Sequence, residues 1–433
     1  MKMTHEQGWL ALVGVLLCLG GRSGYAAAAA DSGPSAAAGD PSVLLTAASP
    51  IFAGPSATGP VVGFAKLQTE AAQGNADAQY QVGSDYLRGE GVSQDDARAA
   101  SWFQKAAAQG VGPAECDLGY LYETGRGVPR DYRKAAQWYG TAAAQGIANS
   151  QYDLGLLYVH GYGVPQDYAQ ALKWFEASAA QKDSAAEGAV GFLYARGMGV
   201  PQNDGTAVEW YRKAALQGDA YAEANLGSMY LQGRGVARDY AQANHWFRLS
   251  AAQGTTLAQA ALGLAYLYGH GVVPDRAQAL AWLTKAANGG YALAQVLVGD
   301  LYRNGGDYAQ AVRWYEKAAE SGSPQGQYYL GVAYQRGQGV PRDAAQAIHW
   351  FRGAAMGGDG KSQVILGLQY ASGRFVKRDF ELAYAWVALA AEAPNAPPYA
   401  AQIRNALAGH LTAAELAKSQ ERVRSWKAGQ DLQ

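Results

Sequence analysis

Residues 115–146 read ECDLGYLYETGRGVPRDYRKAAQWYGTAAAQG, and this stretch decides the fold. Its first part spaces Leu118 and Tyr122 by four residues, as neighbours on one face of an α-helix are spaced. A Gly-x-Gly-Val-Pro loop follows, and its first glycine stands where a helix C-cap needs positive φ. Asp131 is then the expected N-cap of a second helix with Trp138 on its apolar face. The stretch therefore predicts a helix–loop–helix unit.

The same unit is written nine times along the chain. A tryptophan marks each second helix, and every step is 36 residues except one of 32. A glycine marks each first helix, with Val or Leu just before it, Gln or Glu four residues before it and Tyr three residues after it. We expect this glycine where a neighbouring helix leaves no room for a side chain, and we expect the regular tryptophans and tyrosines to form the core. The glycines are Gly83, Gly119, Gly155, Gly191, Gly227, Gly263, Gly299, Gly331 and Gly367, and the tryptophans are Trp102, Trp138, Trp174, Trp210, Trp246, Trp282, Trp314, Trp350 and Trp386.

Three parts of the array depart from the pattern. The seventh unit lacks the Gly-x-Gly-Val extension between Tyr302 and Trp314, which accounts for the 32-residue step. Residues 63–74 read as a lone second helix that caps the N-terminal end. Residues 394–433 predict a helical cap at the other end, in which a Thr-x-x-Glu capping box at Thr412 opens the last helix.

The motif Ala-Gln/Glu-x-x-Leu-Gly-x-x-Tyr-x-x-Gly-x-Gly-Val, followed by Asp, Ala-x-x-Trp and Ala-Ala, resembles the Sel1-like repeat, a longer-loop relative of the tetratricopeptide repeat. The resemblance covers residues 64 to about 393. It implies an all-α fold, a right-handed superhelical solenoid of nine repeats over 75–393, in which each unit buries apolar surface only against its neighbours. Gln or Glu stands where the tetratricopeptide pattern places a tryptophan in the first helix.

The N-terminus predicts export. Residues 1–30 read as a signal peptide, because Lys2 precedes an apolar run at 9–19 that is too short to span a bilayer, and small Ala-x-Ala sites end at Ala28 and Ala30. A lipid anchor at Cys18 is the alternative, but Leu17 stands where a lipobox has a small residue. Residues 31–62, rich in Ala, Gly, Ser and Pro, read as a disordered tether. We expect a periplasmic or secreted protein without a transmembrane segment after cleavage.

Composition and motifs point away from catalysis. The formal net charge of -1 gives no reason to expect nucleic acid or an anionic membrane as partner. With one cysteine left after signal cleavage, a disulfide framework is excluded, and the lone Cys116 is expected to be buried. The sequence holds no paired histidines, no carboxylate cluster and no nucleophile elbow, so we expect no enzyme, no cofactor and no metal.

A candidate binding face follows from variation within the repeat. The first-helix positions two before, one after and five after each glycine vary most, and their spacing puts them on one face. In solenoids that this motif resembles, the first helix lines the concave surface, so this stripe is the candidate groove for a protein or peptide partner. Its chosen residues are Asp117, Tyr120, Asp153, His160, Phe192, Arg196, Tyr268, Tyr329 and Arg336.

The resemblance implies an exported scaffold that assembles or regulates a cell-envelope complex, for example in exopolysaccharide secretion or in restraint of a signalling receptor. Two alternatives stay open. One is direct binding of an anionic polysaccharide or peptidoglycan, favoured by loop arginines, which are Arg126, Arg130, Arg234, Arg238, Arg342 and Arg374. The other is a secreted factor that acts on host cells.

Overall fold

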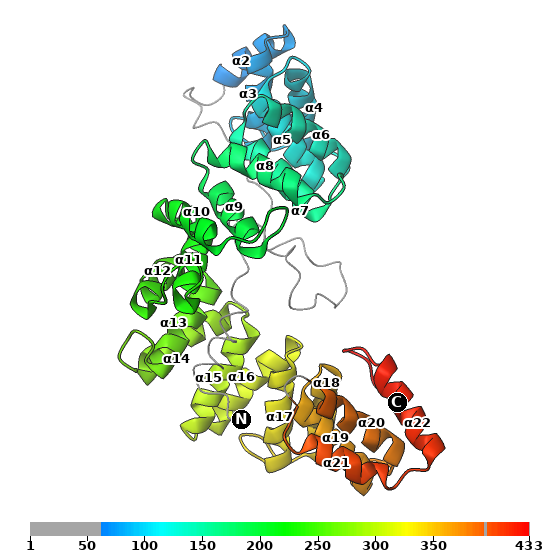
Figure 1. The fold of residues 1–433 in the computed structure, drawn as a ribbon. Coiled ribbons are helices and arrows are strands. Elements are labelled where there is room, and N and C mark those ends of the chain that lie inside the picture. The colour runs from blue at the N-terminus through cyan, green and yellow to red at the C-terminus, as the bar shows by residue number, and fades with distance from the viewer. Residues whose placement is uncertain (1–61, 394–395, 433) are drawn as a thin grey trace. The chain divides into compact units, whose positions relative to one another are not determined.

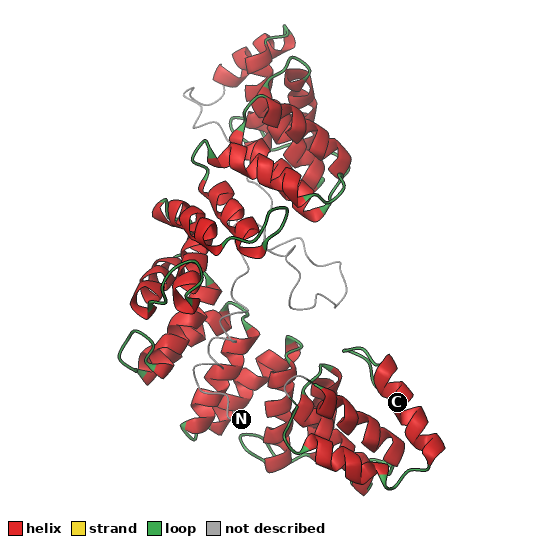
Figure 2. Cartoon of the chain, viewed as in Figure 1, coloured by secondary structure: helices red, strands yellow, loops and turns green. Residues whose placement is uncertain are grey.

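The computed structural model describes residues 62–393 and 396–432, so the expected signal peptide and most of the expected tether lie outside the described residues. The described residues form 21 helices and no strand (Figure 2). The first helices of the nine repeats are α3 (Ala76–Arg88), α5 (Gly112–Thr124), α7 (Ala148–His160), α9 (Ser184–Arg196), α11 (Ala220–Gln232), α13 (Thr256–Tyr268), α15 (Ala292–Asn304), α17 (Pro324–Arg336) and α19 (Gly360–Ser372). The second helices are α4 (Asp96–Ala107), α6 (Tyr132–Ala144), α8 (Tyr168–Ala179), α10 (Asp204–Leu216), α12 (Tyr240–Ala252), α14 (Arg276–Asn288), α16 (Tyr308–Glu320), α18 (Ala344–Met356) and α20 (Phe380–Glu392).

The chain divides into two compact units, residues 1–255 and 256–433, which are described separately. In the described part of the N-terminal unit, each helix from α2 (Val62–Ala72) to α12 packs against the next one along the chain (Figure 1). The C-terminal unit continues in the same way from α13 to α21 (Ala400–Ala408), and α22 (Ala413–Ser425) packs against α20. This is the all-α solenoid of helix pairs that the repeat predicts.

The repeat glycine is the point of closest approach inside each helix pair. A Cβ atom added to Gly155 would lie 2.6 Å from the ring of Phe175, and one on Gly119 would lie 2.7 Å from the ring of Tyr139. All nine repeat glycines meet, within 3 Å of such a Cβ, the residue that follows the repeat tryptophan. The expected close approach is confirmed, because protein interiors leave no slack for an extra methyl group here.

The residue after the tryptophan, rather than the tryptophan, fills the core. Phe175 and Tyr211 are fully buried, whereas Trp210 is half-buried. The expectation that the tryptophans form the core is wrong for eight of the nine, since only Trp386 is fully buried. The other eight lie at the edge of the core, where in four repeats a lysine one turn later covers the indole, as Lys213 does at 3.8 Å from the ring centroid.

The long loop joins each unit to the preceding one. Gly125 ends α5 in the left-handed conformation (φ 73°), and Asp131 caps α6 by accepting from two backbone N–H groups, as predicted. The Asp131 N–H in turn donates to the Tyr122 carbonyl at 2.8 Å, which closes the loop. A Cβ on the second loop glycine, Gly127, would lie 2.2 Å from the backbone of Asp96, the first residue of the preceding second helix. The second glycine of this loop is therefore required by packing between repeats, and four other repeats show the same close approach.

In the shortened seventh repeat, one side chain of the preceding second helix occupies the place of the missing loop. Gly305 and Gly306 alone connect α15 to the N-cap Asp307. The guanidinium of Arg276, the first residue of the preceding second helix, donates to the Leu301 carbonyl near the end of α15. The Arg276 side chain thereby supplies a hydrogen-bond donor at the end of the first helix, at a place that loop backbone occupies in the other repeats.

The Gln or Glu four residues before the repeat glycine ties three helices together. Gln79 donates to the Ala71 carbonyl at the end of α2 at 3.0 Å and accepts from Gln109 at the end of α4 at 2.9 Å. Gln151 makes the same two contacts with Ala143 and Gln181. We call this arrangement the glutamine clasp. Because a Glu side chain has no N–H to give, Glu223 keeps only the bond from Gln253.

Helical caps close both ends of the described array. α2 packs on α3 at the N-terminal end, as residues 63–74 predict. At the other end Thr412 and Glu415 form the predicted capping box that opens α22. The tail that follows returns to the last repeats, since the Gly429 N–H donates to the Met356 carbonyl at 2.7 Å and Leu432 is buried.

Candidate functional site

The structure separates the predicted stripe into buried and exposed residues. Asp117, Tyr120, Asp153 and Phe192 are each at most 4 % exposed. This corrects the expectation that they face a partner. Their positions, two before and one after the repeat glycine, lie on the side of the first helix that packs within the N-terminal unit. A partner therefore has no direct access to these four side chains.

The buried acids of repeats two and three belong to a polar cluster inside the stack. Burial and the neighbouring Asp117 raise the pKa of Tyr80. Burial, Asp153 and Asp117 raise the pKa of the Cys116 thiol well above its usual value. Cys116 is free and buried, as expected, and its thiol stays protonated at neutral pH. The cluster offers no reactive nucleophile.

Five of the predicted residues remain accessible. His160 and Tyr329 are half-buried, and Arg196, Tyr268 and Arg336 are exposed. All but Tyr329 end their first helices, five residues after the repeat glycine, where the side chain clears the packed side. In the N-terminal unit the accessible residues of the stripe are thus His160 and Arg196, and in the C-terminal unit they are Tyr268, Tyr329 and Arg336. We call these five residues the exposed stripe.

Aromatic rings gather at two of these helix ends. In the N-terminal unit the His160 ring stacks on Tyr162 at 5.1 Å, and Tyr162 stacks on Tyr132 at 4.8 Å. In the C-terminal unit Tyr268 lies 6.2 Å from His270. The sequence pattern did not single out Tyr132 and Tyr162, because Tyr132 starts a second helix and Tyr162 lies in a loop, outside the varying positions of the first helix.

The first-helix face is more open over α15, α17 and α19. Tyr329 stacks on Tyr315 at 5.1 Å, and the Arg303 guanidinium lies 4.9 Å above the Tyr329 ring. The Tyr315 hydroxyl donates to Asp300 at 2.7 Å. The stripe positions of α19 are also open, since Leu368 is 45 % exposed, whereas Leu156 at the same repeat position is 3 % exposed.

A pocket of about 350 Å³ lies beside this face. Its lining includes Tyr328 and Tyr329 from α17 and Asp359 and Lys361 at the start of α19. Lys361 lies 5.4 Å from the Tyr328 ring centroid. Two tyrosine rings with a cation and a carboxylate suit a peptide, since aromatic side chains and charges dominate interface energetics.

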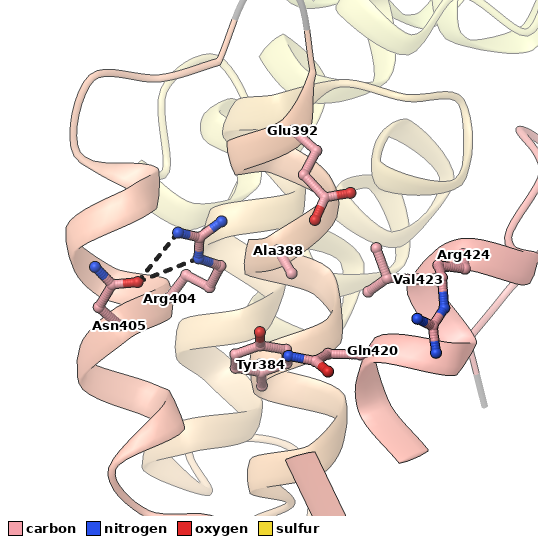
Figure 3. Close-up of a pocket in the computed structure, with 8 residues that line it drawn as sticks. All are labelled: Tyr384, Ala388, Glu392, Arg404, Asn405, Gln420, Val423 and Arg424. Atoms are coloured by element: carbon pink, nitrogen blue, oxygen red, sulfur yellow. Dashed lines mark hydrogen bonds between the residues drawn. The ribbon is translucent and has the colours of Figure 1, made fainter. Parts of the chain in front are cut away.

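A second pocket, of about 430 Å³, lies in the C-terminal cap among α20, α21 and α22. Figure 3 shows Arg404 and Asn405 of α21 on one side and Gln420 and Arg424 of α22 on the other. Arg404 donates to the Asn405 side chain, and Arg424 is paired with Glu421 at 2.7 Å. Arg404 thus donates to a neutral amide, Arg424 pairs with a carboxylate, and Glu392 also lines the pocket, so the lining carries charges of both signs.

Two of the six loop arginines are paired with aspartates inside the stack, which weakens the basic edge that glycan binding would use. Arg126 makes two hydrogen bonds of 2.9 Å to Asp96, and Arg234 likewise binds Asp204. Each pair joins one repeat to the preceding one, so the charge is neutralised within the stack. Arg130 and Arg374 instead lie over Tyr132 and Phe375.

Two features of the described residues bear on metals and membranes. Among them, no group of three or more His, Cys, Asp or Glu side chains is placed to hold a metal ion. None of the helices described is both long and apolar enough to cross a bilayer.

Comparison with known proteins agrees with the geometry. A family model described as Sel1 repeat matches nine consecutive segments over residues 76–395, the seventh being the short one at 292–323. A Sel1 repeat protein from Oxalobacter formigenes has a similar structure, with 34% identity and a TM-score of 0.56 over 76% of this chain and 98% of that one. A protective antigen of uropathogenic Escherichia coli strains, described as displaying an SLR fold, is 33% identical with a TM-score of 0.50 over 83% and 85% of the chains. No protein of curated function matches the chain.

Proposed function

Because this chain belongs to the Sel1 repeat family, whose members are generally protein–protein interaction scaffolds and typically not catalysts, we propose that it is an exported scaffold of the cell envelope. Its exposed stripe binds a protein or peptide partner and so assembles or regulates an envelope complex. The observation that carries this proposal is the accessibility of aromatic and arginine side chains at first-helix ends in each unit, Arg196 in the N-terminal unit and Tyr268 and Arg336 in the C-terminal unit.

Direct glycan binding is the weaker alternative. Two of the six loop arginines form bidentate pairs with aspartates of the preceding repeat. The remaining aromatic stack of Tyr132, Tyr162 and His160 favours a small sugar contact over a long anionic chain. A secreted factor acting on host cells is the other alternative, and the similarity to a protective antigen supports it.

Site-specific crosslinking tests the scaffold proposal. A photoreactive phenylalanine analogue is placed at Arg196, Tyr268 or Arg336, and in matched controls at Glu209 or Arg248, which are exposed on second helices. In intact cells we expect one crosslinked partner from the stripe positions and none from the controls. Equal crosslinking from both sets would refute the stripe as the binding face.

Export is tested separately. The charged start, short apolar run and Ala-x-Ala sites support cleavage near Ala30. N-terminal sequencing of protein from a periplasmic extract is expected to begin near Asp31. A mature chain that starts at a lipid-modified Cys18 would instead place the solenoid on a membrane.

A further inference from the structure

In five repeats the second loop glycine lies against the backbone of the preceding second helix, but repeat nine has no glycine at this position. Phe375 stands where other repeats have the second loop glycine, and it keeps the left-handed conformation (φ 69°) with its ring 62 % exposed. A Cβ at the same place in repeat eight, on Gly339, would lie 2.3 Å from the backbone of the preceding second helix. A non-glycine residue held at positive φ is strained, and such strain is concentrated at functional sites.

The loop around Phe375 is strongly basic. Arg374, Lys377 and Arg378 are all exposed within five residues of chain. No carboxylate of the described residues lies within ion-pair distance of Lys377 or Arg378. The one acid in this loop, Asp379, is engaged as the N-cap of α20 and accepts from the Leu382 N–H at 3.0 Å.

An open pocket of about 510 Å³ lies directly beside this loop. Its cationic lining is Arg352 of α18, Lys377, Arg378 and Arg422 of α22, and its other lining residues are Tyr370, Val376, Leu382 and one acid, the N-cap Asp379. Arg352 donates to the Tyr370 hydroxyl at 2.9 Å, which fixes its guanidinium at the wall. Glu381 lies 3.9 Å from Arg422 but is shared with Lys418 at 2.8 Å, so the lining stays positive in balance.

The chain's own C-terminal residues indicate what kind of ligand this surface accepts. Asp431 lies 3.7 Å from the Arg352 guanidinium, at the edge of the pocket. The Gly429 N–H donates to the Met356 carbonyl at the end of α18. Leu432 is buried in the apolar cluster that contains Tyr370 and Leu382. An acidic residue followed by an apolar one, held by a backbone hydrogen bond, therefore already packs here.

We propose that this pocket, bounded by α18, α19, α20, α22 and the 373–379 loop, binds an acidic peptide segment of a protein partner. Carboxylates of the segment pair with Lys377, Arg378 and Arg422, and an apolar side chain packs on the exposed Phe375 ring. Asp431 competes with the ligand for Arg352. The proposal deepens the proposed scaffold function, on which it rests, by assigning the chemistry of one partner.

Fluorescence anisotropy on the full-length chain tests the proposal with a defined probe. The probe is the labelled peptide Asp-Asp-Leu-Asp-Asp-Leu, and its uncharged twin is Asn-Asn-Leu-Asn-Asn-Leu. We expect salt-sensitive binding of the acidic peptide only. Lys377→Gln with Arg378→Gln should weaken binding by more than tenfold. Asp431→Asn should strengthen it severalfold, because it frees Arg352.

The two arginines of the other C-terminal pocket provide the matched control. Arg404→Gln with Arg424→Gln removes the same charge from a surface at the same cap and should leave the affinity unchanged. Phe375→Gly restores the glycine of the other repeats, so it should raise the melting temperature while weakening the peptide. Opposite changes in stability and affinity are the signature of a residue kept for binding.

Three outcomes would overturn the proposal. They are equal binding of the uncharged twin, equal loss of affinity in the control pair, and binding of phosphatidylglycerol vesicles without binding of the peptide, which would assign the surface to anionic lipid. The test is independent of the crosslinking experiment above. If the exposed stripe yields no partner but the peptide still binds here, the stripe proposal fails and the pocket proposal stands.

Discussion

The glutamine clasp gives a prediction whose sign depends on pH. Six repeats carry Gln at the clasp position of the first helix, and five of these side chains donate to a backbone carbonyl of the preceding second helix; they are Gln79, Gln151, Gln295, Gln327 and Gln363. Glu223 has no N–H to make that bond, and it is 3 % exposed. Burial, as the largest cause, raises the pKa of Glu223 from 4.5 to about 7. The folded state therefore prefers the neutral carboxyl.

The sign of the pH dependence follows from this shift. The unfolded chain loses the Glu223 proton near its ordinary pKa, while the folded chain holds it until about pH 7. The contribution of Glu223 to the free energy of unfolding is thus fully present below its pKa in the unfolded chain, and it is lost as pH rises through its pKa in the folded chain. One pKa unit corresponds to about 1.4 kcal/mol, so the shift sets an upper limit of about 3 kcal/mol at alkaline pH. Partial hydration of the carboxylate reduces the expected value to about 1–2 kcal/mol.

Glu223→Gln removes the buried charge and restores the donor of the clasp. The new amide still accepts from Gln253 and is placed to donate to the Ala215 carbonyl, which corresponds to Ala143 in the Gln151 clasp. We expect the variant to exceed the natural protein in stability by about 1–3 kcal/mol near pH 8.5, and by clearly less near pH 5, where the natural carboxyl is protonated. Guanidinium unfolding at both pH values measures the difference, and hydrogen exchange of α11 amides localises it.

Glu209→Gln is the matched control, because Glu209 lies exposed on α10 of the preceding repeat. It removes the same charge from the surface and should change the stability by less than about 0.5 kcal/mol at either pH. A stability gain for Glu223→Gln that is the same at both pH values, or a loss at alkaline pH, would show that the buried carboxylate does not carry the cost assigned to it.

Three further predictions concern packing in the repeats. Tyr211→Ala should destabilise the protein by about 3–5 kcal/mol, and Trp210→Ala by about half as much, because Tyr211 is fully buried and Trp210 is not; equal losses on chemical unfolding would contradict the assignment of the core. Gly155→Ala should cost about 1–3 kcal/mol, since the methyl group meets the Phe175 ring, whereas Gly140→Ala in α6, where a Cβ meets nothing within 4 Å, should stabilise by about 0.5–1 kcal/mol; melting curves of the two variants should shift in opposite directions. Ser321→Gln should add about 0.5–1.5 kcal/mol by completing the clasp on Gln295, whose side-chain oxygen is buried without a hydrogen bond, and an unchanged unfolding midpoint would refute this.

The sequence predicts the helix ends well because they are fixed by local chemistry. Gly125 adopts the left-handed C-cap and Asp131 caps the next helix, as their residue types require. The role of the repeat glycine is equally predictable. A glycine inside a helix costs stability, so its regular use indicates a close neighbour that leaves no room for a side chain. These features need only the residues within one repeat.

Which side of a helix is buried was harder to predict. Trp138 and Tyr139 are adjacent, so helical spacing alone leaves both near the apolar side. The structure buries Tyr139 fully and leaves Trp138 at the edge. A signal was available, because the residue after the tryptophan is Phe, Tyr, Leu or Val in all nine repeats. The same limit explains Tyr120 and Phe192, whose burial depends on how closely successive first helices pack.

The same residue type can be buried in one repeat and exposed at the equivalent position of another. This difference in exposed fraction distinguishes a binding surface from the scaffold better than residue type does. Leu156 in repeat three is 3 % exposed, while Leu368 in repeat nine, one residue after its own repeat glycine, is 45 % exposed. Leaving such a side chain in water costs about 25 cal/mol for each Å² of apolar surface. The nearby loop adds Phe375, which is both exposed and strained. Lys182 in repeat three also has positive φ, and Val273 in repeat six is also exposed, but only repeat nine of the described array combines an exposed first-helix leucine with an exposed aromatic ring at positive φ. This combination argues that the last repeat keeps an unfilled surface for a partner.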